Sequence, residues 1–266
     1  RLLLKMIDIH SHILSNVDDG AKSIEESIDM VKLYLDIGIK KVIATPHYIE
    51  GCKNSSKEEN IIALERLREA IYQEGLDFEI YLGNEIYIAM DIFTLLENKK
   101  VATLNDSRYI LLEFPMLDMP IFVENLIYNL LLKGYVPVIA HPERNKKIID
   151  DPNILYNLIN KGALAQLNLP SLEGKYGDKV RITVEILLKY NMIHFIGTDA
   201  HSKNERSPRV KDGLNILKDL VDNKAFEEIT YTNPSKVIED KEIYPNAPIK
   251  YIKKNSFFNF LKAKLH

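Results

Sequence analysis

The sequence predicts an α/β fold: a distorted seven-stranded (β/α)7 barrel of the TIM-like kind, with one domain spanning residues 1–266. Two observations lead to this fold class. Short apolar segments alternate with longer segments of helical periodicity, and the connections between them are short. A chain of 266 residues with 46% hydrophobic and 27% charged residues also has the composition of a globular protein with a large core. An open sheet of seven strands has the same order of elements and remains the alternative.

The predicted strands are nearly continuous in apolar residues, which is typical of parallel strands covered on both faces. They lie near Met6–His10, Lys41–Thr45, Glu79–Gly83, Tyr109–Glu113, Val136–His141, Leu164–Asn168 and Ile193–Gly197.

Helical patterns fill the segments between these strands. They are expected over Ser23–Ile37, Lys57–Glu74, Pro120–Lys133, Asn145–Lys161 and Val180–Tyr190. Ser23 followed by Glu26 predicts a capping box at the start of the first helix, in which each side chain binds the backbone N–H of the other residue.

Charge and cysteine content exclude several classes of protein. The chain has 35 Lys and Arg against 38 Asp and Glu, so it lacks the basic surplus of a nucleic-acid-binding protein. Cys52 is the single cysteine, which excludes a disulfide framework and indicates a reducing compartment, so we expect a cytoplasmic protein. No apolar segment approaches the roughly 18 residues that a membrane span requires.

The C-terminal tail, residues 243–266, differs from the rest of the chain. It has no acidic residue, and its lysines are interleaved with Phe257, Phe258 and Phe260. This pattern predicts a segment that contacts a membrane surface or a partner. A terminal helix packed on the barrel and a frayed end have the same composition.

Histidines gather where strands are predicted to end. Of the seven histidines, only His194 and His266 lie elsewhere. The others are His10, His12, His47, His141 and His201, and the carboxylates Asp19, Glu85, Glu113 and Asp199 fall at the same level. Barrel active sites form at this face from residues of different strands. Because residues i and i+2 of a strand share a face, the imidazoles of His10 and His12 point the same way.

These nine residues indicate a metal centre. Glu113 and His141 each end an apolar strand, where an unpaired polar group is costly and a cation removes the cost. Each residue alone can be explained as a hydrogen-bonded core group, but that explanation must hold at all nine positions. Three divalent ions on four carboxylates leave a net charge near +2 (order of magnitude), which favours a phosphate dianion. Arg144 and Arg206 follow two of these histidines and can donate to a phosphoryl group.

At these residues the chain resembles the polymerase-and-histidinol-phosphatase (PHP) family of metal-dependent phosphoesterases. It is most similar to the bacterial protein-tyrosine phosphatases of that family, which serve capsule and exopolysaccharide synthesis. The resemblance runs from Met6 to Asp240 and is carried by Met6–His12, Val17–Gly20, Ala44–His47, Gly83–Tyr87, Leu104–Tyr109, Leu112–Phe114, Ile139–Arg144 and Thr198–His201. It does not include the tail.

The resemblance implies a PHP fold and three divalent ions, expected to be Mn²⁺, with Fe or Zn as alternatives. One ion would be held by His10, His12, Glu85 and Asp199, a second by Glu85, Glu113 and His141, and a third by Asp19, His47 and His201. Arg144 and Arg206 match positions implicated in phosphate binding. The implied substrate is a phosphotyrosine protein, the tyrosine-rich tail of a membrane autokinase that acts as a polysaccharide co-polymerase.

Two other functions remain open. A PHP-type phosphatase of a small phosphomonoester, such as histidinol phosphate, would have the same metal residues, and a non-catalytic metal-bound scaffold would show no turnover. A cysteine-based phosphatase is not expected, because a Cys-x5-Arg phosphate loop starting at Cys52 requires arginine at position 58, where Glu58 stands. We expect metal-activated water to hydrolyse the ester without a covalent enzyme intermediate.

Overall fold

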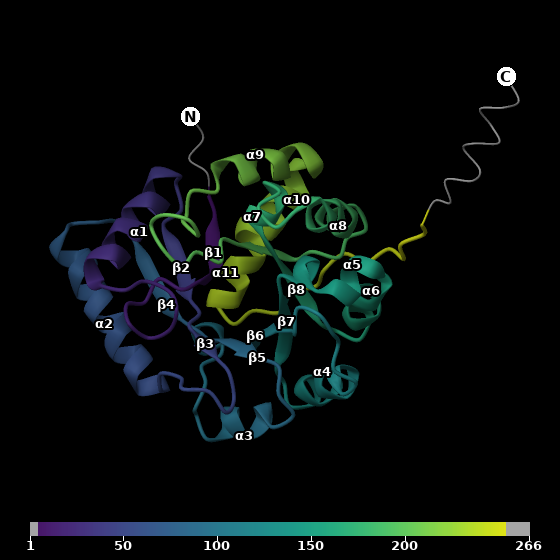
Figure 1. Cartoon of the computed structure of the whole chain (residues 1–266), viewed down its shortest axis with the longest axis horizontal. Helices are drawn as coiled ribbons and strands as arrows, with labels where there is room; N and C mark the ends of the chain where they lie inside the picture. Colours follow the sequence, from purple (N-terminus) through teal and green to yellow (C-terminus); the bar gives the residue numbers. More distant parts are fainter. Residues whose placement is uncertain (1–4, 254–266) are drawn as a thin grey trace, which may run out of the picture.

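The computed structural model describes residues 5–253 and shows an α/β fold in which every strand pairing is parallel. The strands are β1 (Ile7–Ser11), β2 (Lys41–Ala44), β3 (His47–Tyr48), β4 (Glu79–Leu82), β5 (Glu85–Tyr87), β6 (Tyr109–Glu113), β7 (Val136–Ala140), β8 (Leu164–Asn168) and β9 (Phe195–Gly197). They lie at the centre of the molecule, with helices around them (Figure 1). The predicted fold class and all seven predicted strands are confirmed.

The strands form two sheets, with the orders β1-β2-β4 and β3-β5-β6-β7-β8-β9. The break falls at Thr45–Pro46 and Gly83–Asn84, where β2 gives way to β3 and β4 to β5. Pro46 has no N–H to donate to a ladder, which accounts for one of these interruptions. The first strand, β1, and the last, β9, are joined just beyond their carboxyl ends. There Asp199 N donates to His10 O at 2.9 Å and His12 N donates to Ala200 O at 2.8 Å. The sequence did not predict the division into two sheets.

The two longest helices, α1 and α2, follow β1 and β3, and shorter helices make up the rest. They are α1 (Ile24–Asp36), α2 (Lys57–Gln73), α3 (Ile92–Glu97), α4 (Val123–Leu132), α5 (Lys146–Asp150), α6 (Asn153–Asn160), α7 (Leu169–Leu172), α8 (Asp178–Lys189), α9 (Lys211–Leu220), α10 (Asn223–Glu227) and α11 (Asn233–Ile238). Helices α3, α7, α9 and α10 were not predicted.

Two helix predictions need correction. The segment Asn145–Lys161 is two helices, because Pro152 cannot continue α5 and instead opens α6. At α1, Ser23 accepts a hydrogen bond from Glu26 N, but Glu26 Oε2 binds the N–H of Lys22 instead of returning to Ser23. The predicted capping box is therefore only half formed.

The buried core includes the strands up to their carboxyl ends. Every residue of β1 is buried, including the polar Asp8, His10 and Ser11. Because parallel strands are covered on both faces, polar groups in β1 must find partners inside the protein. The barrel thus brings its polar side chains together at the carboxyl ends of the strands.

The tail is described only in part. Ile249 N donates to Tyr190 O at 2.9 Å, and the backbone of Tyr251 exchanges hydrogen bonds with the Asn153 side chain, so Ile249 and Tyr251 attach this segment to the α6 and α8 side of the barrel. The phenylalanines of the predicted membrane-contact segment lie outside the described residues. Within residues 5–253, no helix is long and apolar enough to cross a membrane.

Candidate metal centre

All nine residues that the sequence predicts as metal ligands lie near or beyond the carboxyl ends of the strands β1, β2, β4, β6, β7 and β9. His10 is on β1 and Glu113 ends β6, whereas His47 and Glu85 follow β2 and β4 and are the first residues of the short strands β3 and β5. The other five lie in the segments after β1, β7 or β9: His12, Asp19, His141, Asp199 and His201. His141 and Asp199 have left-handed backbone conformations, with φ of 31° and 52°. Such conformations cost free energy in residues other than glycine and are concentrated at functional sites.

The first group of side chains contains His10, His12, Glu85 and Asp199, which are all buried. Glu85 Oε2 lies 3.1 Å from His10 Nε2 and 3.2 Å from His12 Nε2. Asp199 Oδ1 lies 3.6 Å and 3.5 Å from the same two nitrogens. Four donor atoms therefore face one point, as they do around a bound cation.

The second group is centred on Glu85 and Glu113. His141 Nε2 lies 2.8 Å from Glu85 Oε1 and 3.9 Å from Glu113 Oε1. His47 also approaches these carboxylates, because its Nδ1 lies 3.1 Å from Glu85 Oε2 and 3.8 Å from Glu113 Oε2. Glu85 contributes to both groups, as expected of a bridging ligand, while the position of His47 beside Glu113 was not predicted.

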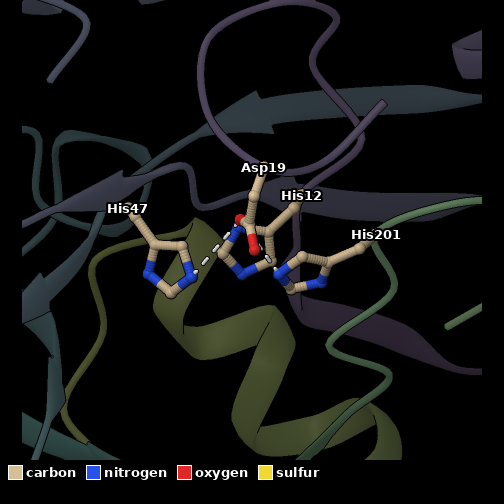
Figure 2. Close-up of side chains that lie close together, drawn as sticks. All are labelled: His12, Asp19, His47 and His201. Atoms are coloured by element: carbon tan, nitrogen blue, oxygen red, sulfur yellow. Dashed lines mark ion pairs between the residues drawn. The ribbon is translucent and has the colours of Figure 1, made fainter. Parts of the chain in front are cut away.

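The third group contains His12, Asp19, His47 and His201, shown in Figure 2. The Asp19 carboxylate lies between two imidazoles, 3.3 Å from His201 Nε2 and 3.6 Å from His47 Nε2. The Asp19 side chain is 61% exposed, whereas that of His201 is 5% exposed. Solvent therefore reaches the centre at this group, beside a cavity of about 740 Å³ lined by Asp18, Asp19 and His47.

Several buried atoms of these groups lie close to another predicted ligand atom, such as His47 Nδ1 at 3.1 Å from Glu85 Oε2, without forming a hydrogen bond. His47 Nδ1, Glu85 Oε2 and His201 Nε2 are buried and form no hydrogen bond among the described residues. Unsatisfied buried polar atoms are rare in folded proteins and call for an explanation. Imidazole nitrogens and carboxylate oxygens suit Zn²⁺, Fe and Mn²⁺, so the residues fit a cluster of divalent cations.

The electrostatics of the cluster support the same interpretation. Burial opposes protonation of His12, but its hydrogen bonds to Asp18 and Glu85 raise its pKa to about 10. Burial raises the pKa of Glu113 to about 7, and the neighbouring Glu85 adds to this shift. In the protein without metal, protons would therefore occupy the positions that divalent cations would take.

The two predicted phosphate-binding arginines both reach Asp199. Arg144 Nη1 donates to Asp199 Oδ2 at 3.1 Å, and Arg206 Nη2 lies 2.8 Å from Asp199 Oδ1. Their guanidinium groups are partly exposed and lie at the edge of the first group. This position allows them to contact an anion that approaches the centre.

Residues that the sequence analysis missed hold these ligands in place. Asp18 accepts a hydrogen bond from His12 Nδ1 at 2.7 Å, which leaves Nε2 to face the centre. His10 Nδ1 donates to Gln166 Oε1 at 2.8 Å. Gln166 Nε2 then donates to Asn168, whose Nδ2 donates to Asp199 Oδ2 at 2.7 Å. Two features of the sequence could have indicated these residues: the acidic pair Asp18–Asp19, and the i, i+2 spacing of Gln166 and Asn168 on β8.

Comparison with known proteins agrees with this arrangement. Residues 6–239 match the model of the family described as "Capsular polysaccharide synthesis, CpsB/CapC". The chain belongs to the CpsB/CapC family. The matched range nearly coincides with Met6–Asp240, over which the motifs of the sequence were found.

Two curated relatives are similar over almost the whole chain. The putative tyrosine-protein phosphatase CapC of Staphylococcus aureus is 36% identical over 96% of this chain and all of its own. Tyrosine-protein phosphatase YwqE of Bacillus subtilis is 36% identical over 95% of this chain and all of its own.

A solved structure has the same fold. It comes from a crystallographic study of YwqE from Bacillus subtilis and CpsB from Streptococcus pneumoniae, described there as unique metal-dependent tyrosine phosphatases. It matches with a TM-score of 0.89 and 35% identity, and covers 93% of this chain and all of the other. At this level of identity the similarity extends to sequence as well as fold.

Proposed function

We propose that this chain is a metal-dependent tyrosine-protein phosphatase that acts in capsular or exopolysaccharide synthesis. The observation that carries the proposal is the meeting of nine imidazole and carboxylate side chains in overlapping groups, with two arginines at their edge. Buried imidazole and carboxylate atoms that face one another without forming hydrogen bonds support a cation cluster, and arginines beside it support a phosphate substrate. The names of the CapC and YwqE relatives support phosphotyrosine as that substrate.

The cluster would hold three divalent ions, with Mn²⁺ as our first choice and Fe or Zn as alternatives. The first would be held by His10, His12, Glu85 and Asp199, the second by Glu85, Glu113 and His141, and the third by Asp19, His47 and His201. Such ions lower the pKa of water and neutralise charge on phosphoryl oxygens.

The arginines would orient the substrate. Arg144 and Arg206 share Asp199 as a partner, so their remaining N–H groups are available to phosphoryl oxygens. Their charge would stabilise the negative charge that develops on these oxygens. Tyrosine has a pKa of about 10 and its phenolate leaves readily, so the chain does not require a strong general acid.

The substrate would be a protein. Asp19 is largely exposed, and the cavity beside it is polar and open to solvent, with charged side chains of both signs, so a peptide segment could reach the centre there. As the finer proposal, the substrate is the tyrosine-rich tail of a membrane tyrosine autokinase that acts as a polysaccharide co-polymerase. This reaction would take place in the cytoplasm.

Parallel kinetics on two kinds of substrate test the proposal. The purified protein is loaded with Mn²⁺, Fe²⁺ or Zn²⁺ and assayed on phosphotyrosine peptides and on histidinol phosphate. We expect faster hydrolysis of the peptides, complete loss of activity on chelation, and more than one metal ion per chain by elemental analysis.

The controls separate the alternatives. Cys52→Ser should leave the rate unchanged, because Cys52 is exposed and the proposed chemistry does not use a thiol. A preference for histidinol phosphate would favour a small-ester phosphatase. Absence of turnover on either substrate with metal bound would favour a regulatory scaffold.

A further inference from the structure

Tyr176 lies at the edge of the metal centre, although it belongs to none of the sequence motifs. It sits in the short connection between α7 and α8, in a turn closed by a hydrogen bond from Gly177 N to Gly174 O at 3.0 Å. Both glycines have positive φ, 75° and 92°, a conformation that glycine adopts without strain. Lys175 N donates to Pro170 O at 3.3 Å and attaches the turn to α7.

The turn places the Tyr176 ring against Arg144. The Cζ atom of Arg144 lies 4.5 Å from the centre of the ring, within the range of a cation–π contact. The ring also borders a cavity of about 110 Å³ together with Asp199 and Arg206. Tyr176 is therefore next to both arginines and to the carboxylate that they share.

A stacked aromatic ring holds a guanidinium group in a way that a hydrogen-bond acceptor cannot. Stacking fixes the plane of the group while its N–H donors, which lie in that plane, remain available. Among the described residues, Arg144 has one side-chain hydrogen bond, to Asp199 at 3.1 Å. An acceptor in place of Tyr176 would occupy a second donor that a phosphate oxygen needs.

We propose that Tyr176 is a positioning residue for Arg144, whose guanidinium plane it fixes so that the free N–H groups point at the substrate phosphate. This inference rests on the proposed function, because it takes Arg144 as a phosphate ligand. The ring face makes the contact, so phenylalanine can replace tyrosine and an aliphatic residue of similar size cannot.

The test is a mutant cycle that includes direct phosphate binding. Tyr176→Phe, Tyr176→Leu, Arg144→Ala and the double variant Y176L/R144A are prepared with metal bound. Inorganic phosphate affinity is measured by calorimetry, and kcat/KM is measured on p-nitrophenyl phosphate and on a phosphotyrosine peptide. Tyr72→Leu, at an exposed tyrosine of α2, is the matched control.

We expect Tyr176→Leu to weaken phosphate binding and kcat/KM by about tenfold, the size of a partly desolvated cation–π contact. Tyr176→Phe should retain both, and Tyr176→Leu should have almost no further effect when Arg144 is already alanine. Thermal unfolding of each variant shows whether the substitution impairs folding. The Tyr176→Phe variant and the mutant cycle then distinguish a loss of stability from a loss of Arg144 positioning.

Two results would overturn the inference. One is an equal loss in Tyr176→Phe, which would assign the effect to the hydroxyl. The other is an undiminished effect of Tyr176→Leu in the Arg144→Ala protein. If the proposed function is wrong, the wild-type protein will not hydrolyse the peptide. Calorimetry would still measure the effect of Tyr176 and Arg144 on the affinity for inorganic phosphate, so the two failures can be distinguished.

Discussion

Two buried histidines, one at each end of the barrel, are in opposite electrostatic states. At the carboxyl ends of the strands, His12 is buried beside Asp18 and Glu85, and these neighbours raise its pKa to about 10 against the effect of burial. At the opposite end, His194 precedes β9 and is equally buried, and burial lowers its pKa to about 4. His194 Nδ1 accepts a hydrogen bond from Ala165 N at 3.0 Å.

The comparison of His12 with His194 shows that burial alone does not identify a functional histidine. Burial disfavours the charged imidazole at both ends. The carboxylates beside His12 reverse this preference, whereas burial still lowers the pKa of His47 and of His201 at the same end. The same carboxylates make this place attractive to a divalent cation. His194 is instead a neutral buried histidine near pH 7, and it is not among the predicted metal ligands.

The largest effect should follow removal of the shared carboxylate. In Glu85→Gln, two of the groups lose a charge, so metal content should fall and activity should drop by more than the roughly 10²-fold loss of one charge-stabilising donor. Elemental analysis and phosphatase kinetics check this, with circular dichroism to confirm folding. Full metal content in the variant would contradict the role of Glu85 as a bridging ligand.

A smaller loss should follow removal of one arginine at the same end. Arg144→Ala should lower kcat/KM by about 10²-fold, because one donor to the developing charge is lost. Metal content should remain as in the wild type, since the arginine contacts Asp199 without being a ligand. Steady-state kinetics and elemental analysis measure the two quantities, and a near-normal rate would remove Arg144 from the proposed site.

At the other end of the barrel, His194 should make the stability of the protein depend on pH. The folded pKa of His194 is about 4 and an unfolded histidine titrates near 6.5, so the unfolded state binds more protons between these values. The contribution of His194 is fully present above pH ~6.5 and falls by up to about 3 kcal/mol as the pH drops to ~4.

His194→Asn, which keeps an acceptor for Ala165 N, should lack this loss. Urea unfolding of both proteins at several pH values gives the difference in free energy, in which loss of metal at acidic pH is common to both and cancels. Parallel curves for the two proteins would show that His194 does not titrate in this range.

The smallest effect is expected beneath the metal centre. The hydroxyl of Tyr34 lies 2.8 Å from Asp8 Oδ2 and 2.7 Å from Thr198 Oγ1, and all three residues are buried. Tyr34→Phe leaves these groups short of a partner and should cost about 1–3 kcal/mol of stability. Chemical denaturation measures it, with Tyr72→Phe at an exposed position as the control. An unchanged free energy of unfolding would mean that the Tyr34 hydroxyl adds nothing to the direct hydrogen bonds from Thr198 to Asp8.

Much of the site could be predicted because strands position residues by simple rules. Each predicted ligand lies on a strand or in the segment that follows one, and parallel strands place their carboxyl ends at one face. The alternation of side chains along β1 likewise predicts that His10 and His12 lie together. Helix boundaries were less predictable, and Pro152 divided a segment whose apolar pattern alone indicated one helix.

The sequence by itself determined the alternation of strands and helices, the nine imidazole and carboxylate residues, and the end of the barrel where they meet. These features depend on local periodicity and on the order of elements along the chain. Only the tertiary structure decided that His47 also faces Glu113, that Asp18 and Gln166 contact the histidines, and that the Tyr176 ring lies against Arg144. Such contacts join distant segments through side-chain geometry, which no local pattern specifies.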